Sequence, residues 1–381
     1  MTTSRYIPPK KTLPQKIRRE VRRIGRQIAF PFKPFWGYGT RIAYDRTRAS
    51  TVHVTEGAQP VMDEIAILLI YQPKGLLAST LWQIDWMGRQ GISLIVVTNA
   101  PLRAEDRDKL AGMTHLVVER PNIGYDFGGY REGVMQVMER KYAPRALYVM
   151  NDSMWFPLSE TSDVIERARA APEDVWGLFV DLDSAYRRKI DSGKEHVQSY
   201  FFRFSEKLLR DPVFWSYWKN MSLVSDKRAV IKLREVKLAA YFASKGYSVG
   251  GHNNWLEVAN YLLTLDDEEK MDAILRHRCE VHEDDRAVIA PLLERMTALE
   301  ARDKLREDIA ETKLFLFSTA LHPYVMTDLG FPFLKKQRFA VMVAKRAKIV
   351  EMGLHRNFPE PMQAEIEEWD RDVTEVWPLR R

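Results

Sequence analysis

Glu64-Ile-Ala-Ile-Leu-Leu-Ile-Tyr-Gln72 is an apolar run rich in isoleucine and leucine, which is suited to a strand covered on both faces of its sheet. Leu76–Gln90, directly after it, has the periodicity of a helix and ends at Gly91. The pattern then continues, with strands predicted at Ser93–Thr98, His115–Glu119 and Ala146–Met150 and helices at Ala104–Leu110 and from Asp126 onward. Strands that alternate with helices predict an α/β fold with a mostly parallel sheet flanked by helices.

Beyond residue 150 the pattern is more mixed. The predicted elements are a helix at Ser162–Ala171, strands at Val175–Asp181 and Val197–Phe204, and helices at Val213–Met221, Glu235–Lys245 and Trp255–Leu265. Residues 266–312 are charged and helical in pattern, and a tail with several prolines starts at Leu314. We therefore expect an amino-terminal arm over 1–58, an α/β domain over 59–265 and a helical carboxyl-terminal region over 266–381.

Positive charge is concentrated at the amino-terminal end. Residues 1–50 hold 13 Lys/Arg against two acids (a charge of +11), and the other 331 residues hold 45 Lys/Arg against 50 Asp/Glu, or −5. The acidic body argues against a nucleic-acid-binding surface. Residues 13–29 predict a basic amphipathic helix, and a proline-broken aromatic segment follows up to Tyr38. Such a segment can lie on an anionic membrane surface, so residues 13–38 are a candidate membrane contact; alternatively, the isoleucine stripe packs on the protein itself.

Several features indicate a cytoplasmic protein. No apolar run reaches the roughly 18–20 residues that a bilayer span requires, and no signal-peptide segment follows the basic first residues. Cys279 is the only cysteine, which excludes an internal disulfide and fits a reducing compartment. The motifs of P-loop nucleotide hydrolases, zinc peptidases and α/β-hydrolases are absent from the sequence.

Polar loops follow two of the predicted strands. A ligand of a doubly wound sheet sits beyond the carboxyl ends of the strands. Arg120-Pro-Asn-Ile-Gly-Tyr-Asp-Phe-Gly-Gly-Tyr130 comes after the third strand and opens a helix. Its glycines let a ligand approach the backbone, the helix start favours phosphate, and Asn122 and Asp126 can bond a base or ribose. A tight turn with a helix cap is the alternative interpretation.

Asn151-Asp152-Ser153 comes directly after the fourth strand. A carboxylate at this position, Asp152, can hold a divalent cation on a diphosphate and so stabilise a leaving nucleoside diphosphate. An Asx turn that ends the strand is the alternative. We expect this turn and the loop at Asn122–Asp126 to meet at one edge of the sheet, close enough to bind one diphosphate.

The two loops and further blocks in the same order resemble the rhamnan synthesis protein F family. These blocks are Arg120–Tyr130, Leu147–Pro157, Val175–Leu178, His196–Phe202, Arg234–Val236 and Gly330–Lys335. The resemblance covers about residues 60–340 and implies a GT-A-like glycosyltransferase, with dTDP-rhamnose as the usual donor. It would act in the synthesis of a bacterial cell-surface polysaccharide such as a lipopolysaccharide O-antigen. A growing or lipid-linked glycan would be the acceptor, at the inner face of the cytoplasmic membrane.

The resemblance also implies binding residues. Asn151-Asp152-Ser153 stands where many such enzymes place an Asp-x-Asp metal motif, but only its middle residue is acidic. Asp152 is therefore the metal candidate, and both a weakly held Mg²⁺ or Mn²⁺ and a metal-free mechanism remain open. The predicted nucleotide-sugar-binding residues are Asn122, Gly124, Tyr125, Asp126, Asn151, Ser153, His196, Gln198 and Ser199. The last three belong to a block that is polar at alternate positions; a structural histidine is the alternative for His196.

Transfer with inversion requires a base that takes the proton of the acceptor hydroxyl. Glu235, which we predict to open a helix, is the first candidate, and a carboxylate that stabilises the helix dipole is its alternative role. Asp181 and Asp183, after the strand at Val175–Val180, are the reserve candidates.

Two other functions compete with a transferase. A non-catalytic partner that binds nucleotide sugar or glycan during polysaccharide assembly is favoured by the scarcity of acidic residues around Asp152. A Rossmann-type oxidoreductase is disfavoured because Tyr71-Gln-Pro-Lys74 follows the first strand, where GxGxxG would be expected.

Overall fold

The computed structural model describes residues 33–182, 195–224, 226–311, 314 and 318–371. The strands of its main sheet are β1 (His53–Glu56), β2 (Glu64–Ile70), β3 (Ser93–Thr98), β4 (Leu116–Glu119), β5 (Ala146–Asn151), β7 (Val175–Leu182), β8 (Glu195–Val197), β9 (Phe201–Ser205) and β10 (Val249–Asn254). A second, two-stranded sheet joins β6 (Met154–Trp155) to β11 (Leu334–Lys335).

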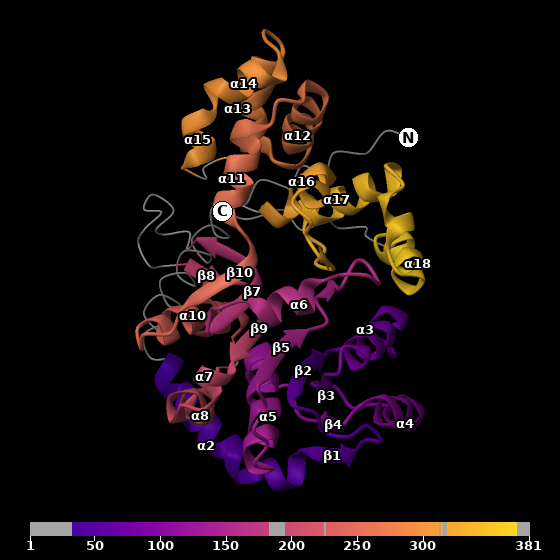
Figure 1. The fold of residues 1–381 in the computed structure, drawn as a ribbon, viewed down its shortest axis with the longest axis vertical. Coiled ribbons are helices and arrows are strands. Elements are labelled where there is room, and N and C mark those ends of the chain that lie inside the picture. Colours follow the sequence, from indigo (N-terminus) through magenta and orange to yellow (C-terminus); the bar gives the residue numbers. More distant parts are fainter. Residues whose placement is uncertain (1–32, 183–194, 225, 312–313, 315–317, 372–381) are drawn as a thin grey trace, which may run out of the picture.

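The main sheet has the strand order β1-β4-β3-β2-β5-β9-β7-β10, and β8 pairs with β7. Strands β4, β3, β2 and β5 are parallel to their neighbours in this run, as β10 is to β7. Strands β1, β8 and β9 pair in the antiparallel direction. This mostly parallel sheet with helices on both sides confirms the predicted fold class (Figure 1).

Helices surround the sheet and fill the carboxyl-terminal third of the chain. In the first half they are α2 (Lys33–Thr51), α3 (Ala78–Arg89), α4 (Ala104–Met113), α5 (Tyr125–Glu139) and α6 (Val164–Ala170). In the middle they are α7 (Glu206–Leu209), α8 (Pro212–Asn220), α9 (Lys227–Val230), the π-helix η2 (Ile231–Glu235), α10 (Val236–Ala243) and α11 (Trp255–Thr264). The last ones are α12 (Glu268–Val281), α13 (Glu283–Leu293), α14 (Ala298–Lys304), α15 (Arg306–Ala310), η3 (Ser318–Ala320), α16 (Pro323–Asp328), α17 (Ala340–Glu351), η4 (Leu354–Asn357) and α18 (Glu360–Trp369). Figure 1 shows α12–α15 gathered at the opposite end of the molecule from β1 and α4.

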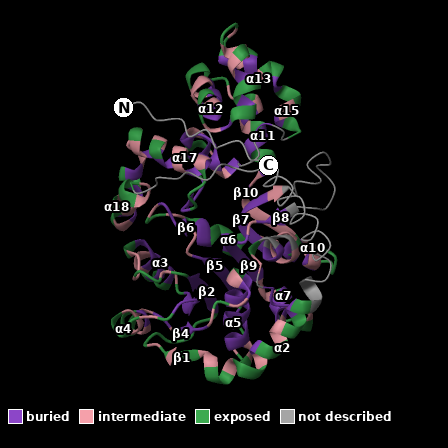
Figure 2. Ribbon diagram, turned by 180° about the vertical axis from the view of Figure 1, so that it is seen from behind, coloured by how far each residue is buried: buried purple, intermediate pink, exposed green. Residues whose placement is uncertain are grey.

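Two hydrophobic cores cover the two faces of the sheet. Side chains of β2 alternate between them because successive residues of a strand point to opposite faces. Ala66, Leu68 and Ile70 pack with residues of α3 and α11, whereas Ile65, Ile67 and Leu69 pack with residues of α5, α8 and α10. Figure 2 shows the result, with buried strands in the middle and exposed residues on outer helices such as α4. The continuous apolar run in the sequence reflects this double burial.

Helix α5 lies unusually close to the sheet. A Cβ atom at Gly129 would come within 2.4 Å of Leu69 Cδ1, and one at Gly133 within 2.4 Å of Ile67 Cγ2. The helix can therefore press on β2 only because both positions lack a side chain. This contact fixes where the first turn of α5, which carries Asp126, lies relative to the carboxyl end of the sheet.

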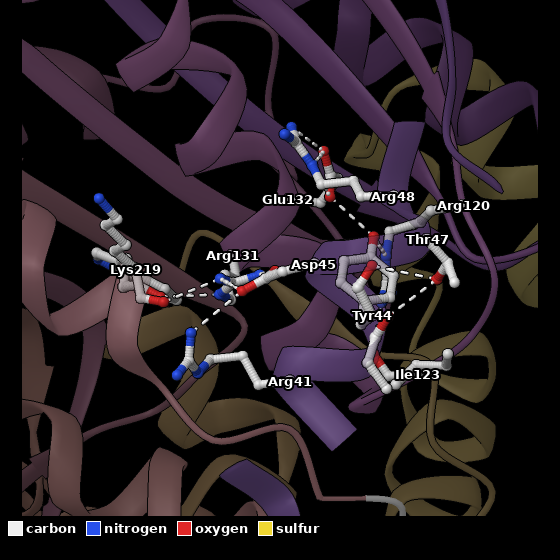
Figure 3. Close-up of polar contacts among 12 residues, drawn as sticks. Arg41, Tyr44, Asp45, Thr47, Arg48, Arg120, Ile123, Arg131, Glu132 and Lys219 are labelled. Atoms are coloured by element: carbon white, nitrogen blue, oxygen red, sulfur yellow. Dashed lines mark hydrogen bonds and ion pairs between the residues drawn. The ribbon is translucent and has the colours of Figure 1, made fainter. Parts of the chain in front are cut away.

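Helix α2 is fastened to α5 by charged side chains (Figure 3). Glu132 of α5 is fully buried and accepts hydrogen bonds from Arg48 Nη2 at 2.6 Å and from the Tyr44 hydroxyl at 2.8 Å. Arg131 donates to the two carboxylate oxygens of Asp45 at 2.7 and 2.9 Å. Burial alone would raise the pKa of Glu132, but the hydrogen bonds and charge of Arg48 lower it. Glu132 is therefore a buried carboxylate whose charge the fold supports.

Parts of the amino-terminal prediction are changed by α2. The segment up to Tyr38 was predicted to be broken by prolines, but the chain is helical from Lys33 onward. Pro34 fits because a proline is tolerated in the first turn of a helix. The predicted basic helix at residues 13–29 lies outside the described residues. None of the described helices combines the length and the apolar character that crossing a bilayer requires.

Two further predictions from the sequence are wrong in detail. The strand expected at Val197–Phe204 is two strands, β8 and β9, because β9 runs antiparallel to both β5 and β7 and the chain must turn before it. Glu235 does not open a helix, because α9, η2 and α10 follow one another without interruption. Within the region predicted to be helical, the tail after Leu314 forms α16–α18, and its strand β11 pairs with β6.

Candidate functional site

The loop after β4 is folded around the buried guanidinium of Arg120. This group donates to Asn99 Oδ1 and to the carbonyl of Ile123, both at 2.5 Å, and to the Tyr44 hydroxyl at 3.1 Å (Figure 3). Gly124 then starts α5 with φ at +81°, a left-handed conformation that glycine adopts without steric cost. The loop predicted to bind the nucleotide is thus held by Tyr44 of α2 and by Asn99, the residue after β3.

The turn after β5 is an Asx turn, as the alternative interpretation predicted. Asn151 Oδ1 accepts from the Ser153 backbone N–H at 3.2 Å and from the Ser153 hydroxyl at 2.6 Å. Asp152 Oδ2 accepts from the backbone N–H of Tyr71 at 3.0 Å and from Gln72 Nε2 at 2.9 Å. The protein itself therefore fixes the orientation of the Asp152 carboxylate.

These residues do not fit a tight metal site. Asp152 is the only carboxylate of the turn, and one of its oxygens already accepts two hydrogen bonds. The amide oxygen of Asn151 is likewise engaged by Ser153. Within the described ranges, no group of three or more His, Cys, Asp or Glu side chains could hold a metal ion. Magnesium and manganese require several oxygen ligands, and this turn has few to offer.

Tyr130 of α5 joins the loop after β4 to the turn after β5. Its hydroxyl donates to the carbonyl of Ser199 at 2.8 Å, and its side chain is hydrogen-bonded to Asn151. Burial, and then the negative charges of Asp126, Glu235 and Asp152, raise its pKa well above the usual value. The charges of three carboxylates from three separate elements therefore act on one buried tyrosine.

Asp126, in the first turn of α5, takes part in the same cluster of charges. Its pKa is raised, first by desolvation and then by the negative charges of Asp152 and Glu235, while the positive charges of Lys227 and Lys335 act in the opposite direction. Asp126 and Asp152 are thus electrostatic neighbours, although β3 and β2 lie between β4 and β5 in the sheet. The helix start, rather than β4 itself, brings Asp126 across to this position.

A second group of predicted residues lies at the end of β7. Asp181 pairs with His196 of β8, and Gln198 Nε2 donates to Asp181 Oδ2 at 3.3 Å. The Gln198 amide also lies 3.4 Å from His196 Nε2. Tyr200 connects this group to the cluster around Tyr130. Burial is the largest cause of the raised pKa of Tyr200, and the negative charges of Asp181 and Glu235 raise it further. Asp181 and Glu235 therefore both act electrostatically on the same tyrosine.

The remaining predicted residues have different positions. Asn122 is exposed on the loop, and the carbonyl of Tyr125 accepts a long 3.4 Å hydrogen bond from Asn99 Nδ2. Ser199 is buried and contributes its carbonyl to Tyr130. His196 lies in β8, whereas Gln198 and Ser199 lie in the turn between β8 and β9, so the three polar residues of this block do not share one strand. Asp183 lies outside the described residues.

Lys335 is the main site residue that sequence reasoning missed. Its Nζ donates to Ser153 Oγ at 3.1 Å and lies 3.8 Å from the centre of the Tyr200 ring. The residue is 6% exposed, and burial lowers the pKa of its ammonium to about 7 despite the nearby charges of Glu235 and Asp126. The sequence identified the block Gly330–Lys335 only as one of the segments that resemble the family, and Lys335 was not among the predicted binding residues. A lysine directly after Phe-Pro-Phe-Leu was a local signal that it is held in an apolar setting.

The family described as rhamnan synthesis protein F matches residues 94–289. The chain is 33% identical over 358 residues to the uncharacterized protein y4gN of Sinorhizobium fredii. The matched segment covers 93% of this chain and 92% of that protein.

Two solved structures are similar at a lower level. The mannosyltransferase PcManGT of Pyrobaculum calidifontis, solved with GDP-Man and Mn²⁺, is 12% identical with a TM-score of 0.30 and covers 90% of this chain and 96% of its own. The mannosyltransferase Ktr4p of S. cerevisiae is 11% identical with a TM-score of 0.23 and covers 46% of this chain and 70% of its own. Values this low support no statement about what the present chain binds.

Proposed function

Because this chain belongs to the rhamnan synthesis protein F family, we propose that it transfers a deoxysugar, rhamnose from dTDP-rhamnose, to a growing or lipid-linked cell-surface glycan. The family and the α/β fold support the broader class, a glycosyltransferase of polysaccharide synthesis. The observation that carries the proposal is the mutual electrostatic influence of Asp126, Asp152, Glu235 and Lys335, together with the 3.1 Å hydrogen bond from Lys335 to Ser153, the residue after Asp152.

Two parts of the site would have different tasks. The loop held by Arg120 and the turn at Asn151–Ser153 would bind the nucleotide and its diphosphate, since a helix start with free backbone N–H groups favours an anion. Asp181 and Glu235, whose charges both act on Tyr200, would face the sugar and the acceptor. One of these two carboxylates would take the proton of the acceptor hydroxyl as its oxygen attacks the anomeric carbon.

A donor screen tests the transferase proposal directly. Purified full-length protein is incubated with dTDP-rhamnose and with UDP- and GDP-linked sugars, and the release of nucleoside diphosphate is measured alongside donor binding by calorimetry. We expect dTDP release from dTDP-rhamnose above all other donors. The Asp152→Asn variant should lose it, whereas Asp272→Asn, a change at a partly exposed residue of α12, should not.

The same assay distinguishes the non-catalytic alternative. A protein that binds a nucleotide sugar but neither hydrolyses nor transfers it would be a binding partner of polysaccharide assembly. Undiminished turnover by Asp152→Asn would remove Asp152 from the mechanism while leaving the transferase class intact.

The catalytic base is tested with Glu235→Gln and Asp181→Asn. Loss of the base should reduce kcat by a factor of roughly 10²–10⁴ with donor affinity nearly unchanged. Equal kcat for a variant and the wild type excludes that carboxylate as the base.

The proposed membrane contact and cytoplasmic-face location rest on residues near the amino terminus. Trp36 is 61% exposed and Tyr38 46% exposed at the beginning of α2, directly after the basic segment of the sequence. Aromatic side chains beside basic ones suit the headgroup region of an anionic membrane. We expect the protein to sediment with vesicles rich in anionic phospholipid, less so as salt rises, and not with neutral vesicles. Equal sedimentation after Arg18, Arg19, Arg22 and Arg23 are all changed to Gln would contradict this.

A further inference from the structure

The segment Gly330–Lys336 is joined to the turn that carries Asp152. Strand β11 pairs with β6 so that Lys335 lies opposite Met154, and the Lys336 N–H donates to the carbonyl of Ser153 at 2.9 Å. The N–H of Leu158 donates to the carbonyl of Pro332 at 3.0 Å. A lysine from the last quarter of the chain is thereby fixed beside the residue after Asp152.

The Lys335 ammonium is buried without a carboxylate partner. Its Nζ has a hydroxyl, Ser153 Oγ, at 3.1 Å and the face of the Tyr200 ring at 3.8 Å. Asp126 and Glu235 act on it through space, but no carboxylate among the described residues forms a salt bridge with it. Its neighbour Lys336 differs, because it lies 3.9 Å from Glu365 Oε2. A buried charge that lacks direct compensation is costly, and it becomes favourable when an anion binds next to it.

Lys335 also lies where a metal ion would otherwise be needed. A glycosyl donor that loses its nucleoside diphosphate must have the developing negative charge of the β-phosphate stabilised. Asp152 and Asn151 form a poor set of metal ligands, as described above, and an ammonium 3.1 Å from Ser153 Oγ would repel a divalent cation held in the same turn. A lysine is a suitable point charge for phosphate.

We propose that Lys335 binds the diphosphate of the nucleotide-sugar donor and stabilises the departing nucleoside diphosphate in place of a divalent metal ion. This inference rests on the proposed transferase function. In the step it serves, the bond between the anomeric carbon and the β-phosphate oxygen breaks, and its electron pair stays on that oxygen, next to the ammonium. The acceptor oxygen forms the new bond to the anomeric carbon, and its proton goes to Glu235 or Asp181.

The test compares wild-type protein with Lys335→Met, Lys335→Arg and a matched control, Lys345→Met. Lys345 is also a buried lysine without a carboxylate partner among the described residues; it donates to the carbonyl of Thr319, and burial alone accounts for its lowered pKa of about 7. Binding of dTDP and of inorganic pyrophosphate is measured by calorimetry in excess EDTA, and dTDP release from dTDP-rhamnose is measured with and without EDTA. Thermal unfolding is recorded for every variant.

We expect wild-type protein to bind dTDP and to turn over donor in EDTA. Lys335→Met should weaken dTDP binding by about 10- to 100-fold, the loss of one charge-assisted contact, and should lower kcat. Its melting temperature should stay the same or rise, because an uncompensated buried charge is removed. Lys335→Arg should restore part of the binding, and Lys345→Met should bind as the wild type does.

The outcomes separate this inference from the proposed function. Turnover that EDTA abolishes and Mg²⁺ or Mn²⁺ restores would overturn the role of Lys335 as the replacement for a metal while supporting the transferase. Equal dTDP binding by Lys335→Met and wild type would overturn it as well. A wild-type protein that neither binds nor turns over any donor would instead refute the proposed function. If Lys335→Met does not fold, two other measurements decide the question. Wild-type protein should bind dTDP in EDTA, and Lys335→Arg should bind it more weakly but measurably.

Discussion

The contact between α2 and α5 can be tested by removing the charge of Glu132. This residue is fully buried, and besides Arg48 and Tyr44 it accepts a hydrogen bond from Gln136 Nε2 at 3.0 Å. Breaking a buried ion pair by removing one partner costs about 3–5 kcal/mol. Arg48 keeps a second partner, Glu139 at 2.5 Å, so we expect Glu132→Gln to lower the free energy of unfolding by about 3 kcal/mol, the low end of that range.

Urea unfolding of four proteins measures this value and its origin. They are wild type, Arg48→Met, Glu132→Gln and the double variant, whose coupling free energy should be about 1–3 kcal/mol. Glu56→Gln is the matched control, because Glu56 forms a 2.5 Å ion pair with Arg140 but its side chain is 64% exposed. That control should lose no more than about 1 kcal/mol. A loss below about 1 kcal/mol for Glu132→Gln, or no coupling with Arg48, would refute the claim that this pair fastens α2 to the fold.

Three more predictions concern Glu132 and two glycines of α5. The pKa of Glu132 is lower in the folded protein than in the unfolded chain. Its contribution to stability is therefore full above the ordinary carboxyl pKa and is lost as pH falls through the folded value. In the Glu132→Gln variant, the free energy of unfolding measured in urea should therefore fall less steeply as the pH is lowered. Gly133→Ala should destabilise the protein by about 1–3 kcal/mol because the added Cβ clashes with Ile67. Gly88→Ala is the control on α3; it has open space around it and should stabilise the protein by roughly 0.5–1 kcal/mol. Equal effects of the two changes on urea unfolding would contradict the close packing of α5. Gly128→Ala places a Cβ 2.0 Å from the carbonyl oxygen of Ile123, so calorimetry should show weakened dTDP binding, and an unchanged affinity would dissociate this loop from the nucleotide.

The sequence predicted the elements that local pattern determines. Ser93–Thr98 is a strand with the predicted bounds because every residue of it is apolar or small and buried between two cores. Strand β10 was not predicted, since Val249-Gly-Gly-His-Asn-Asn254 has no apolar pattern and owes its conformation to pairing with β7. Glu235 was misplaced because nothing in Arg234-Glu-Val reveals that a helix has already begun upstream.

The site was predictable only where its residues lie at the ends of strands or helices that the sequence identifies. Asp126, Asp152 and Asp181 come at or just after the ends of elements that the sequence identifies, so the topology of a parallel sheet predicts that they gather at one edge. Lys335 reaches the same place through the pairing of two residues with β6, which lies about 180 positions earlier in the chain. No periodicity within the tail indicates that partner.

The pairing of β11 with β6 also means that the α/β part cannot be studied alone. A fragment cut at residue 265 would keep every strand of the main sheet, yet it would expose the backbone of Met154 and Trp155 and lack the lysine opposite them. Such a fragment can be folded and still be inert. If Lys335 has the role proposed above, deletion mapping of this chain would assign catalysis to the helical third, although that third would contribute only the Lys335 ammonium to a reaction at the end of the main sheet.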